Sequence, residues 1–209
     1  MRILFQGDSV TDSGRDKCND TEIGFGYTFL VKSELGYNYP EEYEFISRGV
    51  GGNRVVDLYA RIKKDLINVK PDLVSILIGI NDVLHEIGDC PNGIDAEKYY
   101  NIYCLIIEEI KKELPNTKIM IMEPFFLSNI KREGYCEFID KETRIRAIKA
   151  RKVAEKYDLP FIPLQQGFDE LCKKAPPEYW LHDGVHPTSM GYVHIKNQWI
   201  KAFNELMNK

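Results

Sequence analysis

Residue types that could transfer an acyl group lie near both ends of the chain. Gly7-Asp8-Ser9 follows the first apolar run, and Asp183-Gly184-Val185-His186 lies near the C-terminus. A serine nucleophile needs a base to take its proton, and a histidine base needs a carboxylate to hold its far ring nitrogen. Asp183 stands three residues before His186, close enough for that contact. These segments therefore predict a triad of Ser9, His186 and Asp183.

Two intervening segments could supply hydrogen-bond donors for the oxyanion of acyl transfer. They are Gly49-Val50-Gly51-Gly52-Asn53 and Gly79-Ile80-Asn81-Asp82. Backbone N–H groups at a helix start and an asparagine side chain both serve this purpose in hydrolases. A dinucleotide loop is not favoured, because Arg54 occupies the place of its third glycine. A tight turn and helix capping remain the alternatives for these segments.

The serine and histidine segments also have alternative interpretations. Gly-Asp-Ser is a common turn composition, so Asp8-Ser9 could simply cap a helix. His182, Asp183 and His186 could instead hold a zinc ion with one open position. The metal interpretation lacks a third strong ligand at helical spacing, and the sequence contains no His-Glu-x-x-His motif. The triad is therefore the favoured interpretation.

The elements that must position these residues alternate between strands and helices. Five apolar segments predict strands: Ile3–Gln6, Tyr43–Ile46, Leu73–Ile78, Lys118–Met122 and Phe161–Pro163. Apolar residues at three- and four-residue spacing predict helices over Tyr27–Leu35, Val55–Val69, Ala96–Leu114, Lys141–Tyr157 and Ser189–Met207. The alternation predicts a parallel sheet with helices on both faces. Each of the first three strands ends just before a candidate segment, so the site should form at the carboxyl edge of the sheet.

Length and composition limit the classes of protein that fit. The 209 residues show no repeat or linker, so we expect one domain over residues 1–209. A net charge of -4 gives no basic stripe for nucleic acid, and no apolar run is long enough to span a membrane. No secretory leader is visible, and the five scattered cysteines suit free thiols in a reducing compartment. We therefore expect a cytoplasmic protein with no nucleic-acid or membrane partner.

Taken together, these motifs resemble the SGNH (GDSL) esterase superfamily over nearly the whole chain. The matching segments are Gly7-Asp8-Ser9, Gly52-Asn53, Asn81-Asp82 and Asp183-Gly184-Val185-His186-Pro187. The resemblance implies a three-layer α/β/α flavodoxin-like fold with five parallel strands and no cofactor or metal. It also implies that Ser9 is the nucleophile, that His186 is the base oriented by Asp183, and that the oxyanion hole comprises the N–H groups of Ser9 and Gly52 and the side chain of Asn81.

Longer segments resemble an intracellular bacterial branch that includes acetyl xylan esterases and is often oligomeric. These segments include Asp12-Ser13-Gly14-Arg15, Gly24-Phe25-Gly26-Tyr27 and Tyr179-Trp180. Gly51 is a departure, because the branch often has serine there. The resemblance implies a serine esterase that removes small acyl groups, above all acetyl, from carbohydrates. A homo-oligomer is a further expectation.

The identity of the substrate leaves several alternatives open. Asp8, Tyr27 and Trp180 are candidates for substrate contacts, and the two aromatic residues could line a sugar pocket or equally pack in the core. A lysophospholipase or thioesterase would act on longer acyl chains. A carbohydrate-binding module of the same fold, without catalysis, is the alternative from another class. A metal-dependent hydrolase is a third possibility.

Overall fold

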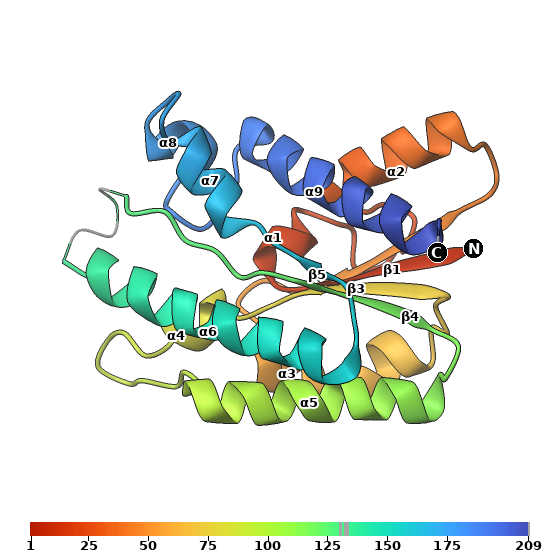
Figure 1. Ribbon diagram of the computed structural model, residues 1–209, viewed down its shortest axis with the longest axis horizontal. Helices are drawn as coiled ribbons and strands as arrows, with labels where there is room; N and C mark the ends of the chain where they lie inside the picture. The colour runs from red at the N-terminus through yellow and green to blue at the C-terminus, as the bar shows by residue number, and fades with distance from the viewer. Residues whose placement is uncertain (130, 132–133, 209) are drawn as a thin grey trace.

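The computed structural model describes residues 1–129, 131 and 134–208, and its centre is a five-stranded parallel sheet (Figure 1). The strand order is β2-β1-β3-β4-β5. The strands span Arg2–Gly7 (β1), Glu44–Gly49 (β2), Leu73–Leu77 (β3), Lys118–Met122 (β4) and Phe161–Ile162 (β5). All five strands coincide with predicted segments, and they differ from the predictions only at their ends. The predicted α/β class and parallel sheet are confirmed.

Helices cover both faces of the sheet and make three layers (Figure 1). Ile3 and Phe5 of β1 join a core with α2 (Tyr27–Asn38) and α9 (Ser189–Met207). Leu4, between them, faces a second core with α5 (Ala96–Glu113) and α6 (Cys136–Tyr157). Successive side chains of a strand point to opposite faces, so a nearly continuous apolar strand suits a sheet that is covered on both sides.

Several helices differ from the predicted ranges. The helix predicted from Lys141 begins at Cys136, and four short helices were not predicted. The latter are α1 (Ser9–Asp12), α4 (Ile80–Leu84), α7 (Gln165–Leu171) and α8 (Pro177–Trp180). Helices of one or two turns contain too few apolar residues to show a period, so the sequence pattern could not reveal them. Three of the four, α1, α4 and α8, adjoin the candidate segments.

The helix predicted over Val55–Val69 is interrupted. It comprises an α-helix, α3 (Val55–Ala60), and a π-helix, η1 (Lys63–Ile67), whose Asn68 N–H donates to the Lys63 carbonyl at 2.9 Å. Between them lies Arg61, whose guanidinium is bonded to three other segments of the chain. Apolar spacing predicts helical segments but not the tertiary bonds that break them, and such π-type irregularities often accompany functional sites.

The end of β1 requires a glycine because β3 and α1 approach it closely. A Cβ atom at Gly7 would lie 2.4 Å from both the Leu77 carbonyl oxygen and the Thr11 hydroxyl. Atoms cannot approach that closely without displacing the backbone, so any side chain here would separate β1 from β3. Gly7 therefore lets the chain turn directly from the sheet into Ser9.

A membrane-spanning role has no support from the helices that the structure describes. None of them combines the length and apolar character that crossing a bilayer requires.

Candidate active site

Ser9 and His186 meet at the carboxyl edge of the sheet, although 177 positions separate them in the chain. Ser9 is the first residue of α1, and its Oγ lies 2.9 Å from Nε2 of His186. Asp8 caps the same helix, because its carboxylate accepts a hydrogen bond from the Val10 N–H at 3.0 Å. The capping interpretation and the nucleophile interpretation therefore describe the same turn.

Asp183 holds the opposite side of the His186 ring. Its Oδ1 and Oδ2 lie 3.1 and 3.0 Å from Nδ1, and Oδ1 also accepts the N–H groups of Val185 and His186 at 3.1 and 2.9 Å. Partial burial acts to raise the pKa of Asp183, but the hydrogen bonds from the His186 side chain and backbone lower it further, well below its ordinary value. A carboxylate in this position keeps the proton on Nδ1, which leaves Nε2 free to accept the proton of Ser9.

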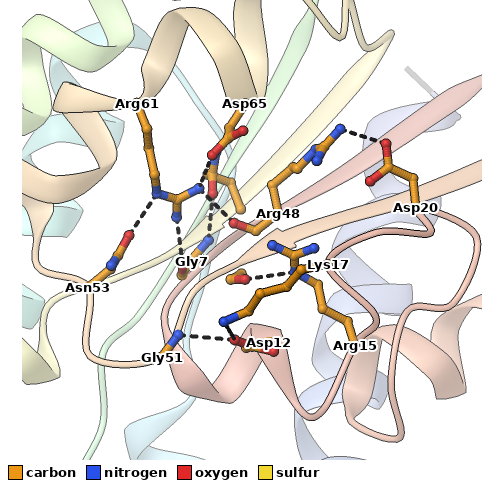
Figure 2. A network of polar contacts seen from close by, with 12 residues as sticks. Gly7, Asp12, Arg15, Lys17, Asp20, Arg48, Gly51, Asn53, Arg61 and Asp65 are labelled. Atoms are coloured by element: carbon orange, nitrogen blue, oxygen red, sulfur yellow. Dashed lines mark hydrogen bonds and ion pairs between the residues drawn. The ribbon is translucent and has the colours of Figure 1, made fainter.

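The glycine loop after β2 lies beside Ser9. Val50 N–H donates to the Gly7 carbonyl at 3.1 Å, and Gly51 N–H donates to Asp12 Oδ2 at 3.1 Å (Figure 2). A Cβ atom on Gly51 would lie 3.8 Å from that of Ser9, an ordinary contact that a serine could make. Within the described residues the Gly52 N–H has no acceptor, as expected of a donor that awaits an oxyanion.

Asn81 approaches the same loop from the end of β3. Its side chain is buried, and its Nδ2 donates one hydrogen to the Asn53 carbonyl at 3.1 Å. The amide carries two hydrogens, so a second donor remains for a ligand. The cap of α4 is Gly79 and that of α3 is Arg54, so neither Asn81 nor Asn53 has the capping role considered from the sequence. The predicted oxyanion residue Asn81 thus contacts the glycine loop that contains Gly52.

Alanine at Gly52 should impair catalysis more than alanine at Gly51. Gly52 has a φ of +80°, where a side chain costs about 1 kcal/mol, while Gly51 has an ordinary φ. We expect Gly52→Ala to lower kcat for an acetyl ester at least about 10-fold by turning its N–H away. Gly51→Ala, the matched control, should stay within about twofold, since its new methyl group meets only the ordinary 3.8 Å contact. Equal kcat values in the two variants would contradict the prediction that the Gly52 N–H is an oxyanion donor.

Two buried carboxyl groups flank the site. Burial raises the pKa of Asp8 to about 7, although the Val10 N–H and nearby His186 oppose the shift. Burial likewise raises the pKa of Asp82 to about 8, although its carboxyl accepts the Val55 N–H at 3.1 and 3.2 Å. These bonds join α4, which contains Asp82, to Val55 at the start of α3. Because α3 directly follows the glycine loop, the Asp82 carboxyl helps to fix the end of that loop.

Asp82→Asn should stabilise the protein increasingly as the pH rises. An unfolded aspartate has a pKa of about 3.9, whereas burial raises that of folded Asp82 to about 8. Between these values the folded state binds the extra proton, so wild-type stability falls as the pH rises. Asparagine keeps an acceptor for Val55 and cannot ionise. We expect a free energy of unfolding about 1–3 kcal/mol above wild type at pH 8, and a much smaller difference at pH 5.

Urea denaturation at the two pH values measures this difference. Asp89→Asn, at an exposed position, is the control and should change stability little at either pH. A pH-independent difference for Asp82→Asn would contradict the prediction.

The candidate substrate-binding residues differ in their exposure. Tyr27 is fully buried and its hydroxyl lies 3.1 Å from that of Thr11, so of its two alternatives the structure supports packing in the core over lining a sugar pocket. Asp8 is also buried, but it lines a small pocket with Val10 and Val185 beside the site, so its contact with substrate stays a prediction. Trp180 is partly buried and donates its indole N–H to the Ala175 carbonyl at 3.2 Å. Trp180 therefore stays a candidate for substrate contact.

The two histidines of the C-terminal segment have different surroundings. His182 is exposed, while His186 faces Ser9. Among the described residues, no group of three histidine, cysteine, aspartate or glutamate side chains is arranged to hold a metal ion. His194 is partly buried, with Nε2 3.1 Å from the Leu164 carbonyl and its ring against Phe168.

Residues that support the site were not singled out from the sequence. Arg61 and Asp65 pair at 2.9 Å, and Asp12 accepts the Gly51 N–H (Figure 2). The spacing of Arg61 and Asp65, four residues apart, predicts an ion pair on a helix, but such pairs are usually exposed and weak. Their partial burial and their bonds to the loop could not be deduced from spacing.

The fold and this arrangement of residues agree with known proteins. Residues 5–193 match the GDSL-like lipase/acylhydrolase family. The chain belongs to this family, which makes it a carboxylic ester hydrolase of the SGNH type. The predicted resemblance is thereby confirmed.

Individual relatives narrow the comparison. The acetylxylan esterase of Geobacillus stearothermophilus is 31% identical over 207 residues, which cover 96% of this chain and 92% of that protein. A crystal structure of that enzyme has a TM-score of 0.83 at 30% identity, covering 96% of this chain and 93% of the other. A structure from Parabacteroides merdae, described as a GDSL-like lipase, has a TM-score of 0.87 at 37% identity, covering 96% and 94%. Two solved variants of the Geobacillus enzyme, in which an aspartate and a serine are each replaced by alanine, are described as catalytic mutants.

Proposed function

We propose that this protein is a serine esterase that removes acetyl groups from carbohydrates through an acyl-enzyme. The observation that carries the proposal is the continuous contact from Asp183 through His186 to Ser9, with the ring nitrogens 3.0 and 2.9 Å from their partners. The catalytic serine and aspartate of the Geobacillus acetylxylan esterase support the same assignment. The relatedness to that enzyme over nearly the whole chain supports the acetyl and carbohydrate specificity.

The reaction has two half-reactions. His186 Nε2 takes the Ser9 proton as Oγ attacks the ester carbonyl carbon, and the carbonyl oxygen becomes an oxyanion. The N–H groups of Ser9 and Gly52 and the free amide hydrogen of Asn81 bind that oxygen. Collapse breaks the bond to the alcohol, which leaves with the proton from His186. Water then attacks the acyl-enzyme by the same steps, and acetate is released with Ser9 restored.

A substrate panel tests this function. Release of acetate from acetylated xylo-oligosaccharides is compared with hydrolysis of p-nitrophenyl esters of two to twelve carbons, with and without a chelator. We expect the highest kcat/KM with acetyl esters and no effect of the chelator. A preference for chains of eight carbons or more would instead indicate a lysophospholipase or thioesterase, and chelator sensitivity would indicate a metal-dependent hydrolase.

A second measurement distinguishes an esterase from a binding module. A fluorophosphonate reacts only with an activated serine, so we expect it to label Ser9 of the wild-type protein. Binding of acetylated oligosaccharides without labelling or acetate release would identify a non-catalytic carbohydrate-binding protein.

A further inference from the structure

Arg61 connects the three segments that surround the candidate oxyanion hole. Its Nε donates to Asn53 Oδ1 at 2.7 Å, and its terminal nitrogens donate to the Arg48 carbonyl at 2.8 Å and to the Gly7 carbonyl at 3.1 Å (Figure 2). The side chain is only 16% exposed and is neutralised by Asp65 at 2.9 Å. Only a planar guanidinium offers enough donors in fixed directions to satisfy four acceptors at once.

The three acceptors other than Asp65 lie close in sequence to a predicted catalytic group. Gly7 ends β1 two residues before Ser9, and Arg48 lies in β2 four residues before Gly52. Asn53 directly follows Gly52, and its carbonyl accepts the hydrogen bond from Asn81 Nδ2 at 3.1 Å. Arg61 therefore contacts the backbone before the nucleophile, the backbone before the loop donor and the residue against which the side-chain donor rests.

We propose that Arg61 is a positioning residue that fixes the oxyanion donors relative to Ser9. The inference rests on the proposed esterase function and adds a residue to its mechanism. The guanidinium does not touch the substrate. It acts through Asn53, which orients the Gly52 N–H and the Asn81 side-chain amide. It also acts through the Gly7 carbonyl, which fixes the position of Ser9 at the end of β1. The π-helix after α3 supports this role, because the chain continues from Arg61 into an irregular turn that carries Asp65.

Loss of the Arg61 guanidinium hydrogen bonds should weaken stabilisation of the transition state rather than substrate binding. The oxyanion exists only after attack, so donors that are displaced by a fraction of an ångström lower kcat and leave KM nearly unchanged. A misplacement of about 1 Å can lower a rate about 100-fold, and a smaller one less. We expect Arg61→Lys, which keeps the charge without the fork, to lower kcat for p-nitrophenyl acetate about 10- to 100-fold, with KM within about threefold of wild type.

Arg48→Lys is the matched control. The Arg48 side chain has similar exposure, 20%, and pairs with Asp20 on the far side of the cluster. We therefore expect kcat of Arg48→Lys within about threefold of wild type. A control loss as large as that of Arg61→Lys would overturn the specific role of Arg61, because any arginine in the cluster would then have the same effect.

A double-mutant cycle with Asn81→Ala separates positioning from general destabilisation. If Arg61 acts through Asn53 on Asn81, part of its effect disappears once the Asn81 side chain is gone. We expect the combined loss of kcat to be smaller than the product of the single losses by at least about fivefold. A combined loss equal to the product would overturn the proposal, as would an unchanged kcat in Arg61→Lys.

Two further arms complete the test. If Arg61→Lys does not fold, Asn53→Ala removes only the bond to Nε and should show the same kcat loss and the same coupling to Asn81→Ala; unchanged kcat there would overturn the proposal. Acetyl-esterase turnover and fluorophosphonate labelling of the wild type are measured first. Their absence would overturn the proposed function together with this inference, whereas an active wild type with unaffected variants would overturn the inference alone.

Discussion

Ser9→Ala is expected to lower kcat for acetyl esters by about 10⁶-fold, near the limit seen when a serine nucleophile is removed. Alanine leaves His186 with no hydroxyl to deprotonate, so the acyl-enzyme cannot form. The neighbouring hydroxyl of Thr11 cannot substitute, because it is fully buried and lies 3.1 Å from the Tyr27 hydroxyl. A residual rate above that in water should remain, since the oxyanion donors are intact. Steady-state kinetics with p-nitrophenyl acetate measures the loss.

The fold should tolerate this substitution. Asp8 continues to cap α1 through Val10, so we expect the melting temperature to stay within about 2 °C of wild type. Ser33→Ala, on the exposed face of α2, serves as the control with unchanged kcat and unchanged fluorophosphonate labelling. Full turnover by a folded Ser9→Ala protein would refute the serine mechanism.

Asp183→Asn should lower kcat about 10⁴-fold while it preserves the fold. The asparagine oxygen can still accept the Val185 and His186 N–H groups, which are 3.1 and 2.9 Å from Oδ1. Its amide can only donate toward Nδ1, so it favours the tautomer in which Nε2 carries the proton. That nitrogen then cannot accept the proton of Ser9. The same kinetic assay, with circular dichroism as a check on folding, measures the effect.

The pH dependence of stability should differ in the same variant. Because the folded pKa of Asp183 lies below its unfolded value, its contribution to stability is present above the unfolded pKa, about 3.9, and is lost as the pH falls through the folded pKa. In Asp183→Asn the free energy of unfolding should therefore fall less than in the wild type as the pH is lowered below about 4.

His182→Ala is the kinetic control. It removes the exposed neighbouring ring and should keep kcat within about twofold of wild type. A loss with His182→Ala as large as that with Asp183→Asn would favour the metal interpretation.

The strands and the grouping of the motifs could be predicted because they depend on local pattern. Leu73–Leu77 is apolar at nearly every position, and parallel strands bring their carboxyl ends to one edge whatever lies between them. Ser9, Asn81 and His186 could therefore be assigned to the same edge before their distances were known.

What could not be predicted depends on tertiary contacts that leave no local pattern. The sequence leaves Tyr27 open to a pocket or to the core. In the structure its ring packs edge-on against Phe5 of β1, which also packs with Trp199 of α9 in the same core. The irregular turn after Ala60 lies at Arg61, whose acceptors come from β1, β2 and the glycine loop. The spacing of apolar residues along one helix does not indicate which distant segments its side chains will contact.

The 177 positions between Ser9 and His186 have a consequence for synthesis on the ribosome. Translation proceeds at roughly 5–20 residues per second, so about 10–35 s separate the appearance of the proposed nucleophile from that of its proposed base. During that interval β1 lacks the cover that α9 provides for Phe5, and under the proposed mechanism no active esterase is expected. Activity should therefore appear only with release of the C-terminal segment, which makes hydrolysis of a fluorogenic acetyl ester a direct measure of completed folding in a cell-free extract.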